Sequence, residues 1–135
     1  MGRNHRPFRF ALDLHSGMPV YRQLIDQVRA GVASGSLSPG DQLPTVRQLA
    51  VDLAINPNTV MRAYRELELT GLLETHQGTG TFIGSKKIEK QSAERDRQLN
   101  QMAGEFAARA GAAGFTVEDL IGRLRELLPA PAQRR

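Results

Sequence analysis

The stretch that decides the fold begins at residue 56 and reads Asn56-Pro57-Asn58-Thr59-Val60-Met61-Arg62-Ala63-Tyr64-Arg65-Glu66-Leu67. Asn56 is a favourable N-cap and Pro57 suits the first helical position, so a helix is expected to begin here. The apolar residues then recur with the i, i+3, i+4, i+7 spacing of a helix that buries one face, namely Val60, Ala63, Tyr64 and Leu67. At about 100° per residue, Asn58, Arg62 and Arg65 fall on the opposite face. The stretch therefore predicts an amphipathic helix with a polar, cationic outer surface.

A shorter helix is predicted immediately before this one. Thr45 and Gln48 have the spacing of a capping box, in which each side chain bonds the backbone N–H of the other residue. The residues expected to face inward are Val46, Leu49, Ala50 and Leu53. Arg47 points outward in the first turn, where a cation opposes the helix dipole, so a phosphate or guanine partner would explain its presence. Only a short connection separates the two helices, which must therefore cross steeply as a helix-turn-helix.

A glycine-tipped hairpin is predicted after the second helix. Residues 72–76 form its first strand, and Thr81-Phe82-Ile83, rich in β-formers, forms the return strand. Gln77-Gly78-Thr79-Gly80 is a tight turn in which both glycines are expected to take positive φ. Such a tip can approach a phosphate closely, although an ordinary hairpin needs the same glycines. Helix, turn, helix and hairpin in this order are typical of a winged helix-turn-helix, whose second helix enters the DNA major groove.

The segment from Pro19 to Ile83 resembles the DNA-binding domain of the GntR family of bacterial transcription regulators. The matching motifs are Pro19-Val20-Tyr21-Arg22-Gln23-Leu24, Leu37-Ser38-Pro39-Gly40-Asp41-Gln42-Leu43-Pro44-Thr45-Val46-Arg47-Gln48-Leu49-Ala50, the stretch from Asn56 to Glu68, Gly71-Leu72-Leu73, and Gly78-Thr79-Gly80-Thr81-Phe82. The Asn-Pro-Asn-Thr variant with a short C-terminal region is similar to the YtrA-like subfamily. The resemblance implies a dimeric regulator, commonly a repressor and often one of ABC-transporter operons.

The resemblance also implies operator contacts at Arg47, Asn58, Thr59, Arg62, Gln77 and Gly78. With their polar neighbours, the candidate DNA-binding residues are Thr45, Arg47, Asn58, Thr59, Arg62, Arg65, Gln77, Gly78 and Thr79. Arg62 is the first choice for a guanine reader, because one arginine can bond guanine O6 and N7 together. Arg47 is expected to read guanine or to hold a phosphate. Asn58 and Thr59 are expected to contact bases or backbone at the helix N-terminus, where the free amides also favour phosphate.

Three features leave alternatives open within this candidate interface. Arg65 can contact DNA, or it can pair with Glu66, Glu68 or an aspartate of the preceding helix. Met61 stands where some family members carry a base-reading arginine. Its side chain can touch a thymine methyl, but it cannot form the bidentate hydrogen bonds that an arginine makes to guanine. Family wings often carry Arg or Lys at places that here hold His76, Gln77 and Thr79. We therefore expect weak phosphate clamping by this wing.

The composition agrees with a small nucleic-acid-binding protein. The chain has 135 residues and a formal net charge of +4, with a pI of about 10.1, so a polyanionic partner is plausible. Residues 1–85 hold eight basic and seven acidic residues, and residues 86–135 hold ten and seven, so the excess charge is not in the helix-turn-helix. The case for DNA therefore rests on where the arginines point.

The same composition argues against an enzyme. The chain contains no cysteine, which excludes a disulfide framework, a thiolate zinc site and a cysteine nucleophile. Its three histidines lie far apart without a ligand-spaced partner, so neither a metal nor a cofactor is expected. No run is long and apolar enough for a signal peptide or a membrane span, and we expect the chain to stay in the cytoplasm.

The residues before the helix-turn-helix are expected to complete the first domain. Residues 1–7 form a short basic arm that is expected to be loose. Residues 8–12 place apolar side chains at alternate positions, which predicts a strand covering the domain. A first helix is predicted from Pro19 to Ser34, and residues 37–43 are predicted to be a loop.

Two further helices and a tail are predicted after residue 85. The first runs over about 86–111, and its apolar stripe is Leu99, Met102, Ala103, Phe106, Ala107 and Ala110. After a Gly-Ala-Ala-Gly break, Thr116 is expected to cap the second helix. The apolar face of that helix is Val117, Leu120, Ile121, Leu124, Leu127 and Leu128. Pro129 is expected to end it, and the tail from about residue 130 is expected to be disordered.

These two helices are too small a unit to bury both stripes against each other. A second copy of the hairpin would complete the core, which predicts a C2 homodimer. The interface is expected to comprise Leu99, Met102, Phe106, Leu120, Ile121, Leu124, Leu127 and Leu128. The alternative is that the hairpin folds back on its own winged helix.

The sequence thus predicts a mostly α protein with a small β-wing. A winged helix-turn-helix DNA-binding domain spans 1–85, with its core at 17–85, and a helical dimerisation region spans 86–135. We expect a sequence-specific DNA-binding transcription regulator, a dimeric repressor on a palindromic operator, with an ABC-transporter operon as a possible target and an unknown small-molecule effector. The alternatives are a winged-helix module for protein–protein contact and a nonspecific nucleic-acid binder.

Overall fold

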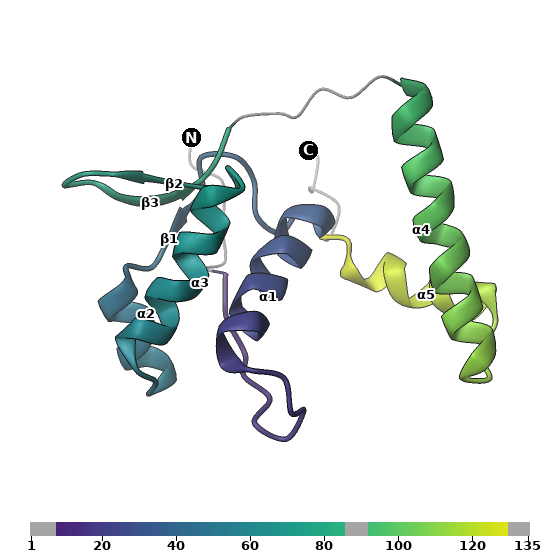
Figure 1. The fold of residues 1–135 in the computed structure, drawn as a ribbon, viewed down its shortest axis with the longest axis horizontal. Coiled ribbons are helices and arrows are strands. Elements are labelled where there is room, and N and C mark those ends of the chain that lie inside the picture. Colours follow the sequence, from purple (N-terminus) through teal and green to yellow (C-terminus); the bar gives the residue numbers. More distant parts are fainter. Residues whose placement is uncertain (1–7, 86–91, 130–135) are drawn as a thin grey trace, which may run out of the picture. The chain divides into compact units, whose positions relative to one another are not determined.

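The computed structural model describes residues 8–85 and 92–129 (Figure 1). The elements follow the order α1 (Val20–Ser34), β1 (Gln42–Leu43), α2 (Val46–Leu53), α3 (Pro57–Leu69), β2 (Leu73–His76), β3 (Gly80–Ile83), α4 (Ser92–Ala112) and α5 (Val117–Leu127). The chain divides into two compact units, Met1–Lys86 and Lys87–Arg135, which are described separately. The expected N-terminal arm, the helical start at 86–91 and the disordered tail lie outside the described residues. The predicted class, mostly α with a small β-wing, is confirmed.

Helices α1, α2 and α3 enclose the core of the first unit. The apolar stripe predicted for α3 is buried, and α1 packs along it (Figure 1). The largest fully buried side chains are Leu24, Ile25, Val28, Val60 and Leu67. Burying one such side chain stabilises the fold by about 1.5–3 kcal/mol. This core holds α3 rigidly, with its polar face turned outward.

Tyr64 joins the core to the start of α2. It is buried on α3, and its hydroxyl donates a hydrogen bond of 2.7 Å to the carbonyl oxygen of Pro44. Burial raises the pKa of Tyr64 above its ordinary value, because the interior disfavours the phenolate. The phenol therefore stays protonated and keeps its donor role, which ties α3 to the residue just before the α2 cap.

The sheet has three antiparallel strands in the order β1-β3-β2. In the wing, Leu73 lies opposite Ile83 and His76 lies opposite Gly80. Gly78 has φ 79° and Gly80 has φ 135°, so the predicted positive φ of both glycines is confirmed. A Cβ on Gly80 would lie 2.6 Å from Nε2 of Gln42, whose side-chain amide donates to the carbonyl oxygen of Thr79. Because glycine has no side chain at position 80, Gln42 has room to hold the wing turn by this hydrogen bond.

Two local predictions are wrong. The sequence predicts a loop over residues 37–43, but Gln42–Leu43 is a strand that pairs with β3. A two-residue strand is too short to show an alternating pattern. Residues 8–12 form no strand: the side-chain amide of Gln27 bonds the backbone N–H and C=O of Ala11, in place of a neighbouring strand. Their apolar side chains still pack against the core, as the alternation indicated.

The second unit consists of α4 packed against α5. Thr116 caps α5 as predicted: its hydroxyl accepts from the N–H of Asp119, and the Asp119 carboxylate accepts from the N–H of Thr116. These hydrogen bonds lower the pKa of Asp119. Among the described residues of this unit, only Ala110 is buried. Both apolar stripes are present, and the two helices leave most of each stripe exposed.

Candidate nucleic-acid interface

The outer face of α3 carries the main candidate residues. The Asn56 side chain accepts a 2.8 Å hydrogen bond from the N–H of Asn58, and Pro57 occupies the first turn, as predicted. Asn58, Arg62 and Arg65 are exposed, and Thr59 is half-buried. A shallow groove of about 320 Å³ runs along this face, lined by Asn58, Met61, Arg62, Arg65, Glu66 and Leu69. The helix thus presents donors, two cations and apolar groups on one surface.

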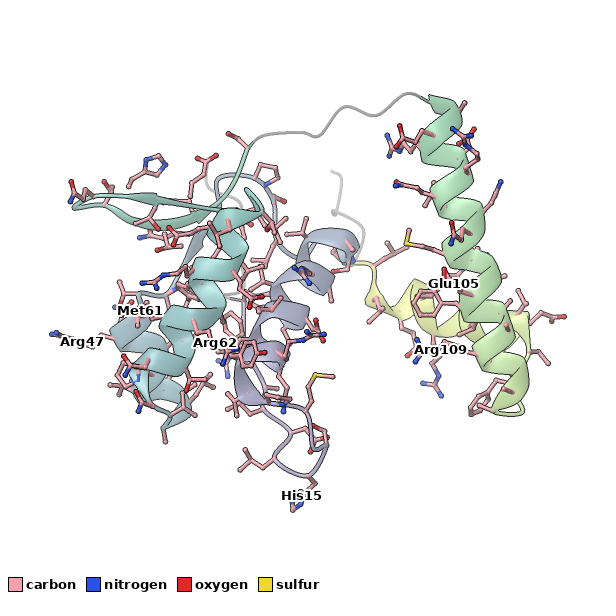
Figure 2. The ribbon with its side chains drawn as sticks, viewed as in Figure 1. His15, Arg47, Met61, Arg62, Glu105 and Arg109 are labelled. Carbon is pink, nitrogen blue, oxygen red and sulfur yellow. The ribbon has the colours of Figure 1, made fainter. Side chains whose placement is uncertain are left out.

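Arg62 and Met61 leave α3 on opposite sides. In Figure 2, Arg62 lies on the side toward α1 and Met61 lies on the side toward Arg47. The guanidinium carbon of Arg62 is 3.8 Å from the centre of the Tyr21 ring, a cation–π contact between α3 and α1. The helical pattern placed Arg62 on the outer face but missed Tyr21. The available signal was an aromatic residue beside the apolar stripe of α1, and no local spacing links it to an arginine so distant in the chain.

Helix α2 adds a second cation to the interface. The predicted capping box is present: the N–H of Gln48 donates to the Thr45 hydroxyl at 3.1 Å, and the Thr45 N–H donates to the Gln48 side chain at 3.0 Å. This cap fixes the first turn of α2, from which Arg47 projects away from the body of the unit (Figure 2). Arg47 is exposed, as contact with a polyanion requires.

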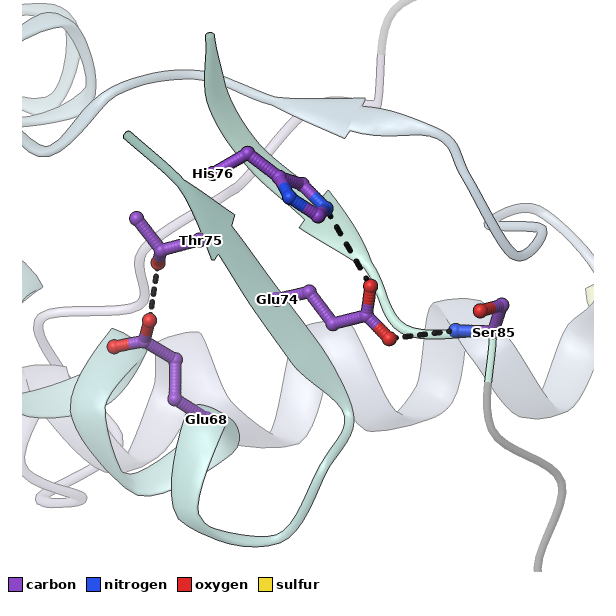
Figure 3. A network of polar contacts seen from close by, with 5 residues as sticks. All are labelled: Glu68, Glu74, Thr75, His76 and Ser85. Atoms are coloured by element: carbon purple, nitrogen blue, oxygen red, sulfur yellow. Dashed lines mark hydrogen bonds and ion pairs between the residues drawn. The ribbon is translucent and has the colours of Figure 1, made fainter. Parts of the chain in front are cut away.

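The alternative ion pairing of Arg65 is not observed. Among residues 8–85 and 92–129, no carboxylate forms an ion pair with Arg65. Glu68, one of its expected partners, instead accepts a hydrogen bond from the Thr75 hydroxyl of the wing (Figure 3). Arg65 therefore keeps its charge available on the outer face of α3.

The wing is held by an acidic residue at its base. The Glu74 carboxylate lies 3.5 Å from Nε2 of His76 and accepts a hydrogen bond of 3.2 Å from the backbone N–H of Ser85 (Figure 3). The His76 ring also packs against Phe82, with 5.4 Å between the ring centres. Residues 72–85 contain no lysine or arginine. The wing can therefore contact DNA through polar side chains and backbone amides. It has no lysine or arginine to pair with a phosphate.

The nine candidate DNA-binding residues all lie in the first unit. Thr45 and Arg47 start α2, Asn58, Thr59, Arg62 and Arg65 line α3, and Gln77, Gly78 and Thr79 form the wing tip. None of the nine is buried. Among the residues that the structure describes, no group of His, Cys, Asp and Glu side chains could hold a metal ion. No helix in the described part of the chain is long and apolar enough to cross a membrane.

Comparison with known proteins identifies the family. Residues 20–83 match the model of the bacterial regulatory proteins of the gntR family. The chain is also 34% identical over 116 residues to the HTH-type transcriptional repressor YtrA of Bacillus subtilis, covering 86% of this chain and 89% of that protein. The chain belongs to the GntR family. The predicted YtrA-like resemblance is confirmed.

Solved structures of transcription regulators agree with this assignment. A transcriptional regulator from Oenococcus oeni is 34% identical with a TM-score of 0.55, covering 88% of this chain and 98% of that one. YtrA from Sulfolobus acidocaldarius, described as a GntR-family transcription factor, is 31% identical with a TM-score of 0.53, covering 70% of this chain and 95% of that one. The chain is therefore a DNA-binding transcription regulator with a winged helix-turn-helix. Because the family consists of transcription regulators, the prediction that the chain is no enzyme is confirmed.

Proposed function

We propose that this GntR-family chain is a cytoplasmic repressor that binds a palindromic operator as a C2 homodimer. The observation that carries the proposal is the exposed apolar face of the second unit. Leu99 is 53% exposed, Phe106 is 54% exposed and Leu124 is 58% exposed. Monomeric proteins rarely expose large contiguous apolar patches. A second copy of α4 and α5 would cover these residues and complete a core.

The proposed interface uses the stripes of both helices. Its residues are Leu99, Met102 and Phe106 on α4, then Leu120, Ile121, Leu124, Leu127 and Leu128 on or just after α5. Leu120 is half-buried and the others are exposed. In a C2 dimer the same patch serves both copies, so one self-complementary surface is sufficient.

In this proposal each α3 enters the major groove of one half-site. Arg62 reads guanine, Asn58 and Thr59 contact bases or backbone at the helix N-terminus, and Arg65 lies further along the groove. Thr45 and Arg47 contact the neighbouring backbone or a guanine. The wing tip follows the flanking phosphates through Gln77, Gly78 and Thr79. The two half-sites lie one helical turn of DNA, or a multiple of it, apart.

Repression is proposed from the relatives. The Bacillus subtilis YtrA carries the name of a transcriptional repressor and covers most of this chain. A dimer bound at a promoter excludes polymerase from the same DNA, which is sufficient for repression without a further domain. The family resemblance supports an ABC-transporter operon as the target.

Binding to the promoter of its own operon tests the proposal. The full chain is titrated against three duplexes at roughly 50 and 200 mM salt. These are the palindromic sequence of that promoter, one of its half-sites and a scrambled sequence. We expect the palindrome to be preferred at both concentrations, because specific sites keep an advantage that salt does not remove. Equal, strongly salt-dependent binding to all duplexes would instead indicate a nonspecific binder. Absence of DNA binding would indicate a protein-docking module.

Light scattering on the same samples tests the dimer. We expect twice the chain mass at micromolar concentration, and two chains on each palindrome. A monomer at that concentration would exclude the proposed interface and favour a hairpin that packs on its own winged helix.

A further inference from the structure

Arg62 is held by an aromatic ring from a different helix. Its guanidinium carbon lies 3.8 Å from the centre of the Tyr21 ring. Tyr21 is half-buried in the first turn of α1, and α1 packs on α3. Within the described ranges 8–85 and 92–129, no hydrogen bond or ion pair joins the guanidinium to another residue. The ring face is therefore the contact that restrains this side chain.

Stacking and hydrogen bonding use different parts of a guanidinium. The ring attracts the flat face of the cation, while the N–H donors point outward in its plane. A guanidinium lying on Tyr21 thus keeps its donor edge open. That edge is the part that bonds O6 and N7 of guanine.

The other arginines of the interface lack such a support. In the described part of the first unit, Arg62 is the one arginine that lies over an aromatic ring. Arg65, one turn further along the same helix, is exposed, and so is Arg47 on α2. Only one of the three cations is therefore oriented by the fold before any DNA arrives, and a base reader gains more from a fixed orientation than a phosphate contact does.

We propose that Tyr21 is a positioning residue for operator recognition. The face of the Tyr21 ring holds the Arg62 guanidinium and thereby sets selectivity at the base pair that Arg62 reads. The inference rests on the proposed function, since it requires a specific operator. It extends the interface to α1, outside the helix-turn-helix and the wing. The ring face alone is required, so the Tyr21 hydroxyl is dispensable.

Binding measurements with ring-retaining and ring-deleting variants test this role. The full-length wild type, Tyr21→Phe, Tyr21→Leu, Arg62→Ala and the double variant Tyr21→Leu/Arg62→Ala are titrated against the operator and a set of single-base-pair changes. Circular dichroism and thermal unfolding establish that each variant is folded. Tyr21→Phe is the matched control, because it keeps the ring and most of the packing against α3.

We expect Tyr21→Leu to weaken operator binding about tenfold and to relax the same base pair that Arg62→Ala relaxes. Tyr21→Phe should stay within about twofold of the wild type. In the Arg62→Ala background, Tyr21→Leu should have no further effect on selectivity, because the two residues act through one contact. A purely structural role would instead weaken binding to every duplex equally.

The outcomes separate this inference from the proposed function. A wild type without operator preference overturns both. A selective wild type overturns the Tyr21 role alone if Tyr21→Leu keeps its preference, binds more tightly or loses affinity uniformly. If Tyr21→Leu does not fold, nitrogen-15 relaxation of the arginine side chains in the free wild type tests the proposal instead. We expect Arg62 to be more ordered than Arg65, and equal order would overturn the proposal.

Discussion

In the first unit α3 buries its whole apolar stripe, with Val60, Ala63 and Leu67 at 0% exposure, whereas in the second unit α4 leaves Leu99 and Phe106 more than half exposed. Both helices are amphipathic, so the difference lies in their neighbours. Helix α3 is covered by α1, α2 and β2, while α4 packs against α5 within its own unit. A stripe is buried only when enough elements surround it, and a two-helix unit does not supply them. The first unit therefore buries its core within one chain, and the second leaves an apolar face that, in our proposal, a second copy covers.

The comparison also separates two kinds of stability. Loss of a core side chain in the first unit leaves a cavity and lowers the free energy of unfolding of that unit. Loss of an exposed apolar side chain in the second unit is expected to change the stability of a single chain little and, if the proposed dimer forms, to weaken association. Two substitutions test this division, and two more test the surface of the first unit and a helix cap of the second, from the largest expected effect to the smallest.

The largest effect is expected for Leu67→Ala in the first unit. Leu67 is fully buried, so its truncation should lower the free energy of unfolding by about 2–5 kcal/mol in chemical denaturation. The matched control is Leu69→Ala on the same helix, because Leu69 is 82% exposed. The control should stay within about 0.5 kcal/mol of the wild type. Similar losses for both variants would contradict the described core.

Phe106→Asp tests the second unit. A carboxylate placed in the proposed interface should weaken dimerisation by about 2–4 kcal/mol, measured as the dissociation constant in analytical ultracentrifugation. Gln101→Asp introduces the same charge at an exposed position of α4 and should change this constant by less than about threefold. Equal dimerisation constants for the wild type and Phe106→Asp would show that Phe106 is not part of the interface.

Arg62→Ala tests the functional surface that the complete first unit presents. The variant should lose about 1–3 kcal/mol of operator binding and relax one base-pair position, because alanine cannot bond guanine. Titration against single-base-pair variants of the operator measures both effects. Arg65→Ala removes the same charge one turn away and is the matched comparison. A uniform loss of affinity across all duplexes would assign Arg62 to phosphate contact instead.

The smallest effect is expected for Asp119→Asn at the cap of α5. Hydrogen bonds with Thr116 lower the pKa of Asp119 below its ordinary value of 3.8. Its carboxylate therefore stabilises the fold above that ordinary pKa, and the contribution is lost as the pH falls through the lower folded value. Circular dichroism should show less helix in Asp119→Asn than in the wild type at neutral pH. The difference should shrink as the pH falls below 3.8 and through the lower folded pKa, and a difference that persists once the carboxylate is protonated would exclude it as the source.

The predictions that succeeded depend on residues close together in the chain. The Thr45 capping box, the caps at Asn56 and Thr116 and the buried stripe of α3 each involve residues within a few turns of one helix. Positive φ at Gly78 and Gly80 follows from a single tight turn. These features are encoded locally, because caps, turns and helical periodicity require only neighbouring residues.

The features that were missed join distant residues. Gln42–Leu43 becomes a strand only because β3 lies beside it, and Ala11 is held by the side chain of Gln27 instead of by a strand. Glu68 bonds Thr75 of the wing, where the sequence offered Arg65 as its partner. In each case the local pattern permitted several partners, and packing selected one.

The helices, the wing turn, the polar face of α3 and the two apolar stripes of the second unit can all be read from the sequence. Each depends only on residues that lie close together in the chain. The tertiary structure alone decided which stripe is buried within one chain, since burial depends on how many elements meet around it. It also decided that Arg62 lies on Tyr21, because that contact exists only once α1 has packed against α3. The reason is the same throughout: local rules act along the chain, and the selection among distant partners is made by packing.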